Sequence, residues 1–193
     1  MNSSKNMGWS FLLLVLIAAL YRAIPGRLPG FAPQIAMAVF AGAIIKDKQW
    51  AIILPVLSMF ISDLLFQLLY IGGFTNMVGF YEGQWQNYLL FALLVFVGMA
   101  IKKLNVLQIA TASLVAPTIY FILSNFLVWA SNGTTRGLDR PKTFDGLILC
   151  YADGLPFFKI SLEATAIFSI ILFGSYYLVQ RKSFKTQSLK PKA

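Results

Sequence analysis

Residues 51–70 read AIILPVLSMFISDLLFQLLY, and Asp63 is the only charged residue among them. A helix that crosses a bilayer needs roughly 20 mostly apolar residues, because each residue adds about 1.5 Å against a hydrocarbon core about 30 Å thick. This run has both the length and the composition. It therefore predicts a transmembrane helix that carries one carboxylate part-way along its length.

The composition of the whole chain points the same way. Of its 193 residues, 58% are apolar and 12% are charged, whereas a soluble domain is about 45–50% apolar and about 25% charged. Histidine is absent and Cys150 is the only cysteine. These counts exclude a histidine base, a metal cage built from histidines or several cysteines, and an internal disulfide. We expect no enzyme activity, no catalytic residues, no metal and no cofactor.

Five further apolar segments predict additional spans, at residues 7–23, 31–45, 85–101, 106–130 and 160–179. Gly/Pro pairs, lysine-rich turns and one long polar stretch separate them. The segment 31–45 is short for a full crossing, and a re-entrant half-helix is its competing interpretation. The segment 7–23 has a signal peptide as its alternative, although no convincing cleavage site follows it. The sequence thus predicts an all-α bundle of six transmembrane helices, forming a single domain over residues 1–193.

Basic residues predict the orientation of this bundle. The chain has 16 basic and 7 acidic residues. Ten of the basic ones fall on the side that holds the turns at 46–48 and 102–103 and the tail at 180–193, and six fall on the other side. The richer side is expected to be cytoplasmic, which places both termini inside. Because no soluble face gathers basic and aromatic residues, we expect no nucleic-acid partner.

Polar residues within the spans are the candidates for function. On insertion scales an Asp at a helix centre costs roughly 2.5–3.5 kcal/mol, so Asp63 should face the protein interior. Either it belongs to a binding or proton-coupling site, or it is a structural acceptor that pairs with a neighbouring helix or with Arg22. Gln67 lies four residues on and shares its face. The candidate solute-binding residues are Asp63, Gln67, Asn125, Trp129 and Tyr151.

The stretch 131–159 is long for a structureless outer loop. Its apolar part, 146–152, is too short to span, so we expect a short surface or re-entrant helix with Asp145 as its N-cap. That helix is either a lid over a cavity or a segment packed on the membrane surface. Cys150, within it, is more typical of an inert apolar residue than of a metal ligand.

Pairs of small residues four apart allow helices to approach closely. Ala19 and Ala23 form one such pair, and Ala38 and Gly42 form another. Either pair is a packing contact inside the bundle or a docking face for another subunit.

Several stretches carry a resemblance to known membrane proteins. They are residues 31–43 (FAPQIAMAVFAGA), 54–65 (LPVLSMFISDLL), 124–129 (SNFLVW), 145–151 (DGLILCY) and 155–158 (LPFF). Over about residues 22–174 the chain resembles a family of small, functionally unassigned bacterial inner-membrane proteins. That family in turn resembles the S components, the membrane-embedded substrate-capture subunits of energy-coupling-factor (ECF) vitamin transporters.

The resemblance implies a six-helix bundle in the bacterial inner membrane that captures a vitamin-sized solute from the outer side. It also implies partners, namely a transmembrane coupling subunit and two ATPase subunits, with the docking face on the first helix at Ala19 and Ala23. The lipid bilayer is the other expected partner. The alternative function is a non-transporting accessory or scaffold subunit of a larger membrane complex.

Overall fold

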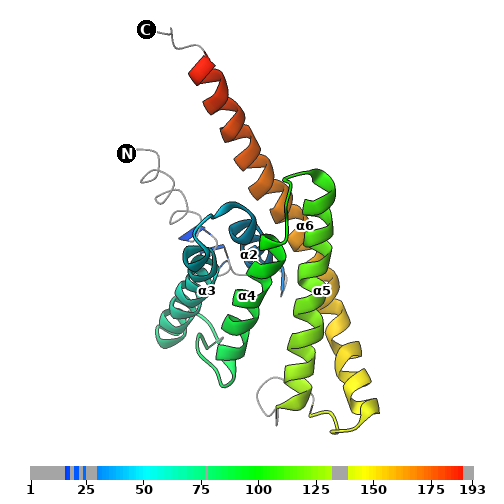
Figure 1. Ribbon diagram of the computed structural model, residues 1–193. Coiled ribbons are helices and arrows are strands. Elements are labelled where there is room, and N and C mark those ends of the chain that lie inside the picture. The colour runs from blue at the N-terminus through cyan, green and yellow to red at the C-terminus, as the bar shows by residue number, and fades with distance from the viewer. Residues whose placement is uncertain are drawn as a thin grey trace.

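The computed structural model describes residues 30–76, 78–131 and 139–188, together with residues 16, 17, 20, 21 and 24; side chains are described as far as Arg181. Within these ranges the chain is helical and has no strand. The five helices in the stretch 30–188, apart from residues 77 and 132–138, are α2 (Gln34–Ile44), α3 (Lys48–Ile71), α4 (Gln84–Met99), α5 (Val106–Ala130) and α6 (Phe144–Ser188), shown in Figure 1.

Three of these helices are long and apolar enough to cross a membrane: α3, α5 and the part of α6 from Phe144 to Arg181. Their presence indicates a membrane protein. The predicted spans at 51–70 and 106–130 are confirmed as long apolar helices. In contrast, α2 has 11 residues and α4 has 16, which correspond to about 16 Å and about 24 Å of helix. Most of the predicted first span, 7–23, lies outside the described residues.

The prediction of a separate short helix in the 131–159 loop is wrong. Helix α6 begins at Phe144 and continues without a break through the predicted sixth span. Pro156 lies inside it and removes one backbone donor, which a helix packed along a neighbour tolerates. Asp145 is in the first turn and is not the cap, because the Thr143 hydroxyl accepts from the Gly146 amide at 3.2 Å.

Helix α2 is the centre of the bundle and packs against each of the other four helices. Every residue from Gln34 to Ala41 is buried. Its small residues bring the α4 backbone close: a Cβ on Gly42 would collide with the Val95 carbonyl oxygen, and one on Gly98 would collide with that of Val39.

The second predicted pair of small residues lies in contacts within the chain. Ala38 has no exposed surface, and Gly42 lies against α4. Both residues therefore contact other parts of this chain, and a docking role for the pair stays a prediction. The other predicted pair, Ala19 and Ala23, lies outside the described residues.

The two ends of the bundle differ in what they carry. The segments 72–83 and 139–143 lie at one end, where α4 and α6 begin and α3 and α5 finish (Figure 1). The turns at 45–47 and 100–105 lie at the other end, beyond which the last turns of α6 project (Figure 1). Asp47 and Asn105 end these turns as N-caps, and their side chains accept from the Gln49 and Gln108 amides at 2.9 Å each.

Candidate functional site

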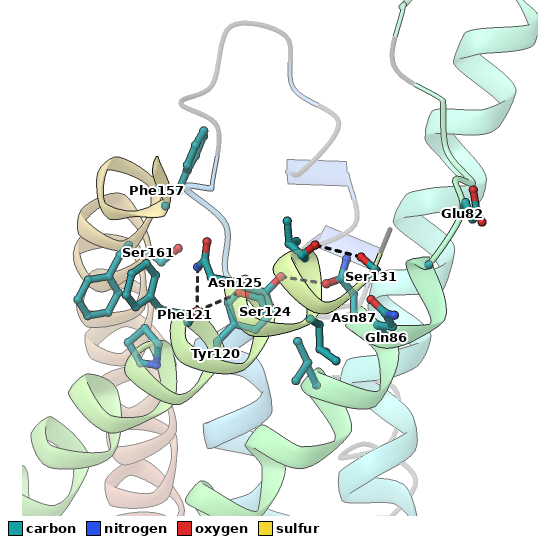
Figure 2. A pocket seen from close by; sticks show the side chains of 17 residues that line it. Glu82, Gln86, Asn87, Tyr120, Phe121, Ser124, Asn125, Ser131, Phe157 and Ser161 are labelled. Carbon is teal, nitrogen blue, oxygen red and sulfur yellow. Dashed lines mark hydrogen bonds between the residues drawn. The ribbon is translucent and has the colours of Figure 1, made fainter. Parts of the chain in front are cut away.

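A cavity of about 540 Å³ opens between the first turns of α4, the second half of α5 and the first half of α6. It is at the end of the bundle that holds the segments 72–83 and 139–143. In Figure 2, Gln86 and Asn87 approach from one side and Phe157 and Ser161 from the other, with the α5 side chains between them. The polar lining residues are Glu82, Gln86, Asn87, Tyr120, Ser124, Asn125, Ser131 and Ser161, and the apolar ones are Leu90, Pro117, Phe121, Leu127, Val128, Phe157 and Phe158.

Helix α5 supplies the floor of the cavity through one of its faces. Phe121 and Asn125 are four residues apart, as are Tyr120 and Ser124, and residues at this spacing lie above one another on a helix. Gly154 of α6 packs directly on Asn125, because a Cβ at that position would collide with the Asn125 amide. The close approach of the two helices places Asn125 at the base of the site, where its Nδ2 donates to the Phe121 carbonyl at 2.8 Å.

The α6 side of the cavity is aromatic. The rings of Phe121 and Phe158 stack with their centroids 4.6 Å apart and 24° between their planes. Phe157 also lines this side. A flat apolar group bound here would contact ring faces and edges, which gives burial of apolar area together with a defined orientation.

The α4 side is polar and is held by hydrogen bonds. Asn87 is 5% exposed; its Nδ2 donates to the Tyr81 hydroxyl at 2.6 Å, and its Oδ1 accepts from the Tyr120 hydroxyl at 3.2 Å. These bonds tie together α4, α5 and the segment that precedes α4. The site thus combines an aromatic wall with an ordered amide–hydroxyl wall.

Asp63 does not line this cavity. Its carboxylate, 1% exposed, accepts from the Gln84 Nε2 and from the Tyr88 hydroxyl, the latter at 2.9 Å. Gln67 also bonds away from the cavity: its Oε1 accepts from the amides of Gly79 and Phe80 at 3.1 and 3.2 Å. Both side chains attach α3 to the segment 79–88. Because this segment contains Asn87, these bonds help to position the polar side of the cavity.

Trp129 and Tyr151 lie beside the cavity without lining it. The Trp129 indole donates to the Pro141 carbonyl at 2.9 Å, and the Lys142 ammonium lies 5.6 Å from the centroid of its ring. The Tyr151 hydroxyl donates to the Ile122 carbonyl at 3.0 Å. Trp129, on α5, therefore contacts residues 141–142, and Tyr151 bonds α6 to α5.

An ion pair fastens the same segment to α6. Arg140 donates to both Asp153 carboxylate oxygens, from Nε at 2.8 Å and from Nη2 at 3.0 Å. This bond raises the pKa of the Arg140 guanidinium above its ordinary value. The two side chains are about one third exposed, so the pair orders the segment 139–143 more than it stabilises the fold.

Of the five predicted binding residues, only Asn125 lines the cavity. Asn87 and Ser124, which also line it, are weaker candidates from the sequence, as polar residues at the start of one span and near the end of another. Gln86, Tyr120 and Ser161 were not predicted. The spacing of Tyr120, Phe121, Ser124 and Asn125 along one helix face was the available signal. These residue types are common in membrane helices, however, and do not by themselves indicate a cavity.

The described residues include no group of three or more His, Cys, Asp or Glu side chains that could hold a metal ion. Cys150 is buried, with its Sγ 3.5 Å from the Asn125 carbonyl oxygen. The lining offers hydrogen-bond donors, acceptors and ring faces, which are the means of binding a small molecule.

Comparison with known proteins indicates a family but no function. Neither the curated proteins nor the solved structures contain a match to the chain. Residues 2–189 match a family of unknown function, DUF6580, and because the match covers nearly the whole sequence, the protein belongs to that family.

Proposed function

We propose that this protein is a membrane solute-capture protein, similar to the S components of ECF transporters. The observation that carries the proposal is the cavity of about 540 Å³ between α4, α5 and α6. Pockets for small molecules are typically about 300–1,000 Å³, largely apolar, with a few placed polar groups. This cavity has the volume of such a pocket, with aromatic rings on one side and amides and hydroxyls on the other.

The position of the cavity supports capture from outside the cell. It is at the end of the bundle opposite the basic turns at 46–48 and 102–103, and the basic side is the expected cytoplasmic side. We propose that the chain crosses the bacterial inner membrane six times with both termini in the cytoplasm. Under this proposal α2 and α4 also cross the membrane. Because both are shorter than the hydrocarbon core, adjoining non-helical residues that are buried inside the protein complete each crossing.

The resemblance to S components extends the proposal to partners. A transmembrane coupling subunit and two ATPase subunits would drive release of the solute, and the coupling subunit would dock on the first helix at Ala19 and Ala23. The chain's own part is then binding alone, since the cavity lining carries groups that bind and orient.

The test is to purify the full chain in detergent and to measure small molecules that stay bound to it by native mass spectrometry. The wild-type protein should carry a solute. Replacing Ser124, which lines the cavity, by Val, Leu and Phe in turn fills the space progressively and should lower the bound fraction in that order. Ser175→Phe, on an exposed part of α6, is the matched control and should keep the solute.

Two outcomes would overturn the proposal. One is a wild-type protein that carries no small molecule, whatever the source of membranes. The other is a bound molecule whose occupancy is the same in Ser124→Phe as in the wild type. Recovery of a stoichiometric protein partner without any bound solute would favour the accessory-subunit alternative.

A further inference from the structure

A second, smaller cavity lies beneath the N-terminus of α2. Its volume is about 210 Å³, and Gln34, Met59 and Tyr81 are among its lining residues. Asn87, Tyr120 and Ser161 line both this space and the larger cavity. The two spaces therefore share a wall, and the smaller one is here called the inner cavity. At this volume it is below the usual range for a whole drug-sized ligand and fits one ring or head group.

Gln34 is the unusual residue of this inner space. It is 3% exposed, and within the described structure neither its Nε2 nor its Oε1 has a hydrogen-bond partner. Two buried amides at the start of α4 are paired by contrast: Gln84 bonds to Asp63 and Tyr81, and Asn87, which lines both cavities, bonds to Tyr81 and Tyr120. Buried polar side chains are nearly always hydrogen-bonded, so a wholly unpaired amide that lines a cavity indicates a missing partner.

The backbone around Gln34 adds donors. Helix α2 begins at Gln34, and its N-cap, Pro33, makes no side-chain capping bond. The first amide groups of a helix have no partner within it, and this end of the helix carries partial positive charge. Gln34 and Ile35, in this first turn, both line the inner cavity. The helix end thus favours an oxygen acceptor on any molecule held there.

We propose that the inner cavity binds the neutral cis-amide edge of a solute, as found in a lactam, a cyclic ureide or a pyridone. Such an edge presents one N–H and one C=O side by side. The N–H donates to Gln34 Oε1, and the C=O accepts from Gln34 Nε2, next to the α2 N-terminus. The apolar remainder of the solute then lies in the larger cavity against Phe121 and Phe158.

The pairing needs of Gln34 argue against an anion. A carboxylate has acceptors only, so it would satisfy Nε2 and leave Oε1 facing a second negative oxygen. The described polar side chains of the inner cavity are also all uncharged. This inference rests on the proposed function and gives the chemical class of its solute.

The experiment measures binding of three small probes to the full chain in detergent by saturation-transfer NMR: 2-pyridone, benzoate and toluene. They represent a neutral cis-amide, an anion and an apolar ring. We expect 2-pyridone to bind at least tenfold more tightly than the other two. Gln34→Leu and Gln34→Met should each weaken binding of 2-pyridone at least tenfold. Ser58→Ala, which removes another buried side-chain oxygen that is unpaired among the described residues, should leave it unchanged.

Thermal unfolding separates a binding role from a structural one. Because the Gln34 amide is unpaired without solute, Gln34→Leu should unfold at an equal or higher temperature than the ligand-free wild type. A variant that unfolds at a clearly lower temperature would overturn the binding role and indicate a structural one.

The remaining outcomes are also decisive. Tighter binding of benzoate, equal binding of 2-pyridone to wild type and Gln34→Leu, or no binding of 2-pyridone would each overturn the inference. If the wild type still carries a solute that Ser124→Phe loses, the proposed function stands without this inference. If no solute is bound either, both fall.

Discussion

Asp63 lies in the middle of an apolar helix, and its neighbours explain how a carboxylate is accommodated there. It accepts from Gln84 and Tyr88, both on α4 and four residues apart, so that one face of α4 meets one face of α3. Gln84 also accepts from the Tyr81 amide at 3.1 Å. The carboxylate therefore organises the start of α4, from which Asn87 reaches the cavity. We infer that its role is to position the start of α4.

This role predicts that Asp63→Asn is tolerated in part. An amide keeps one oxygen that accepts from Gln84 and Tyr88, but loses the charge that strengthens these bonds. We expect unfolding free energy to fall by about 1 kcal/mol, compared with about 2–4 kcal/mol for Asp63→Leu, which leaves buried donors unpaired. Denaturant unfolding of the purified protein measures both losses.

Asp145→Asn is the matched control, because Asp145 is exposed in the first turn of α6; the change should cost less than about 0.5 kcal/mol. Solute occupancy should be within twofold of the wild type in Asp63→Asn, since Asp63 does not line the cavity. Complete loss of the solute at unchanged stability would show instead that the charge itself takes part in binding.

At the level of helices, α2 and α4 cross so closely that a side chain cannot fit at either of two glycine positions. Gly42 faces the α4 backbone near Val95, and Gly98 faces the α2 backbone near Val39. Glycine costs about 1 kcal/mol relative to alanine inside a helix, so its use on both helices indicates that backbone contact is needed there. This crossing holds α4 against α2 and thereby keeps Asn87 beside the inner cavity.

The crossing predicts opposite effects for two alanine substitutions. Gly98→Ala puts a methyl group into the Val39 carbonyl, so the helices must separate, and we expect a loss of about 1–3 kcal/mol of unfolding free energy. Gly174→Ala, in α6, meets no described atom within 4 Å and should be neutral or stabilising by up to about 1 kcal/mol. Thermal unfolding in detergent compares the two; equal melting temperatures would contradict the close crossing.

For the molecule as a whole, the fold was predictable where hydropathy alone sets a helix. The 106–130 span coincides with α5, and the 51–70 span lies within α3. The continuity of α6 was not predictable, because Asp153, Gly154 and Pro156 have the composition of a break. Packing against α5 carries the helix across them: Gly154 fits against Asn125, and Asp153 is paired with Arg140.

The site was harder to predict than the fold. Asp63 attracts attention in the sequence because burying a charge is expensive. The cavity is lined instead by ordinary polar residues such as Asn87 near the start of α4 and Tyr120 and Ser124 in the second half of α5. Gln34 lies in the stretch 31–43 that carries the resemblance, but its spacing to other polar residues does not single it out. Its importance comes from the absence of a partner, which depends on how α2 sits among the other helices and is not encoded in local spacing.

The arrangement of charge over the bundle predicts its orientation. The turns at 45–47 and 100–105, with Lys48 just after the first, lie at one end of the bundle (Figure 1) and carry Lys46, Lys102 and Lys103. The cavity is lined by the first turns of α4, the second half of α5 and the first half of α6, towards the other end. Since cytoplasmic segments are enriched in Lys and Arg, a fluorescent protein fused after Ala193 should be fluorescent. Alkaline phosphatase inserted after Asp139 should be active, and the same enzyme inserted between Lys102 and Lys103 should be inactive.

The reverse pattern would place the cavity mouth in the cytoplasm, and a protein that takes up solute from outside cannot have that orientation. A fluorescent C-terminus together with an inactive insertion at Asp139 would mean that α5 and α6 do not carry the chain across and back, which would remove the outward-facing site altogether.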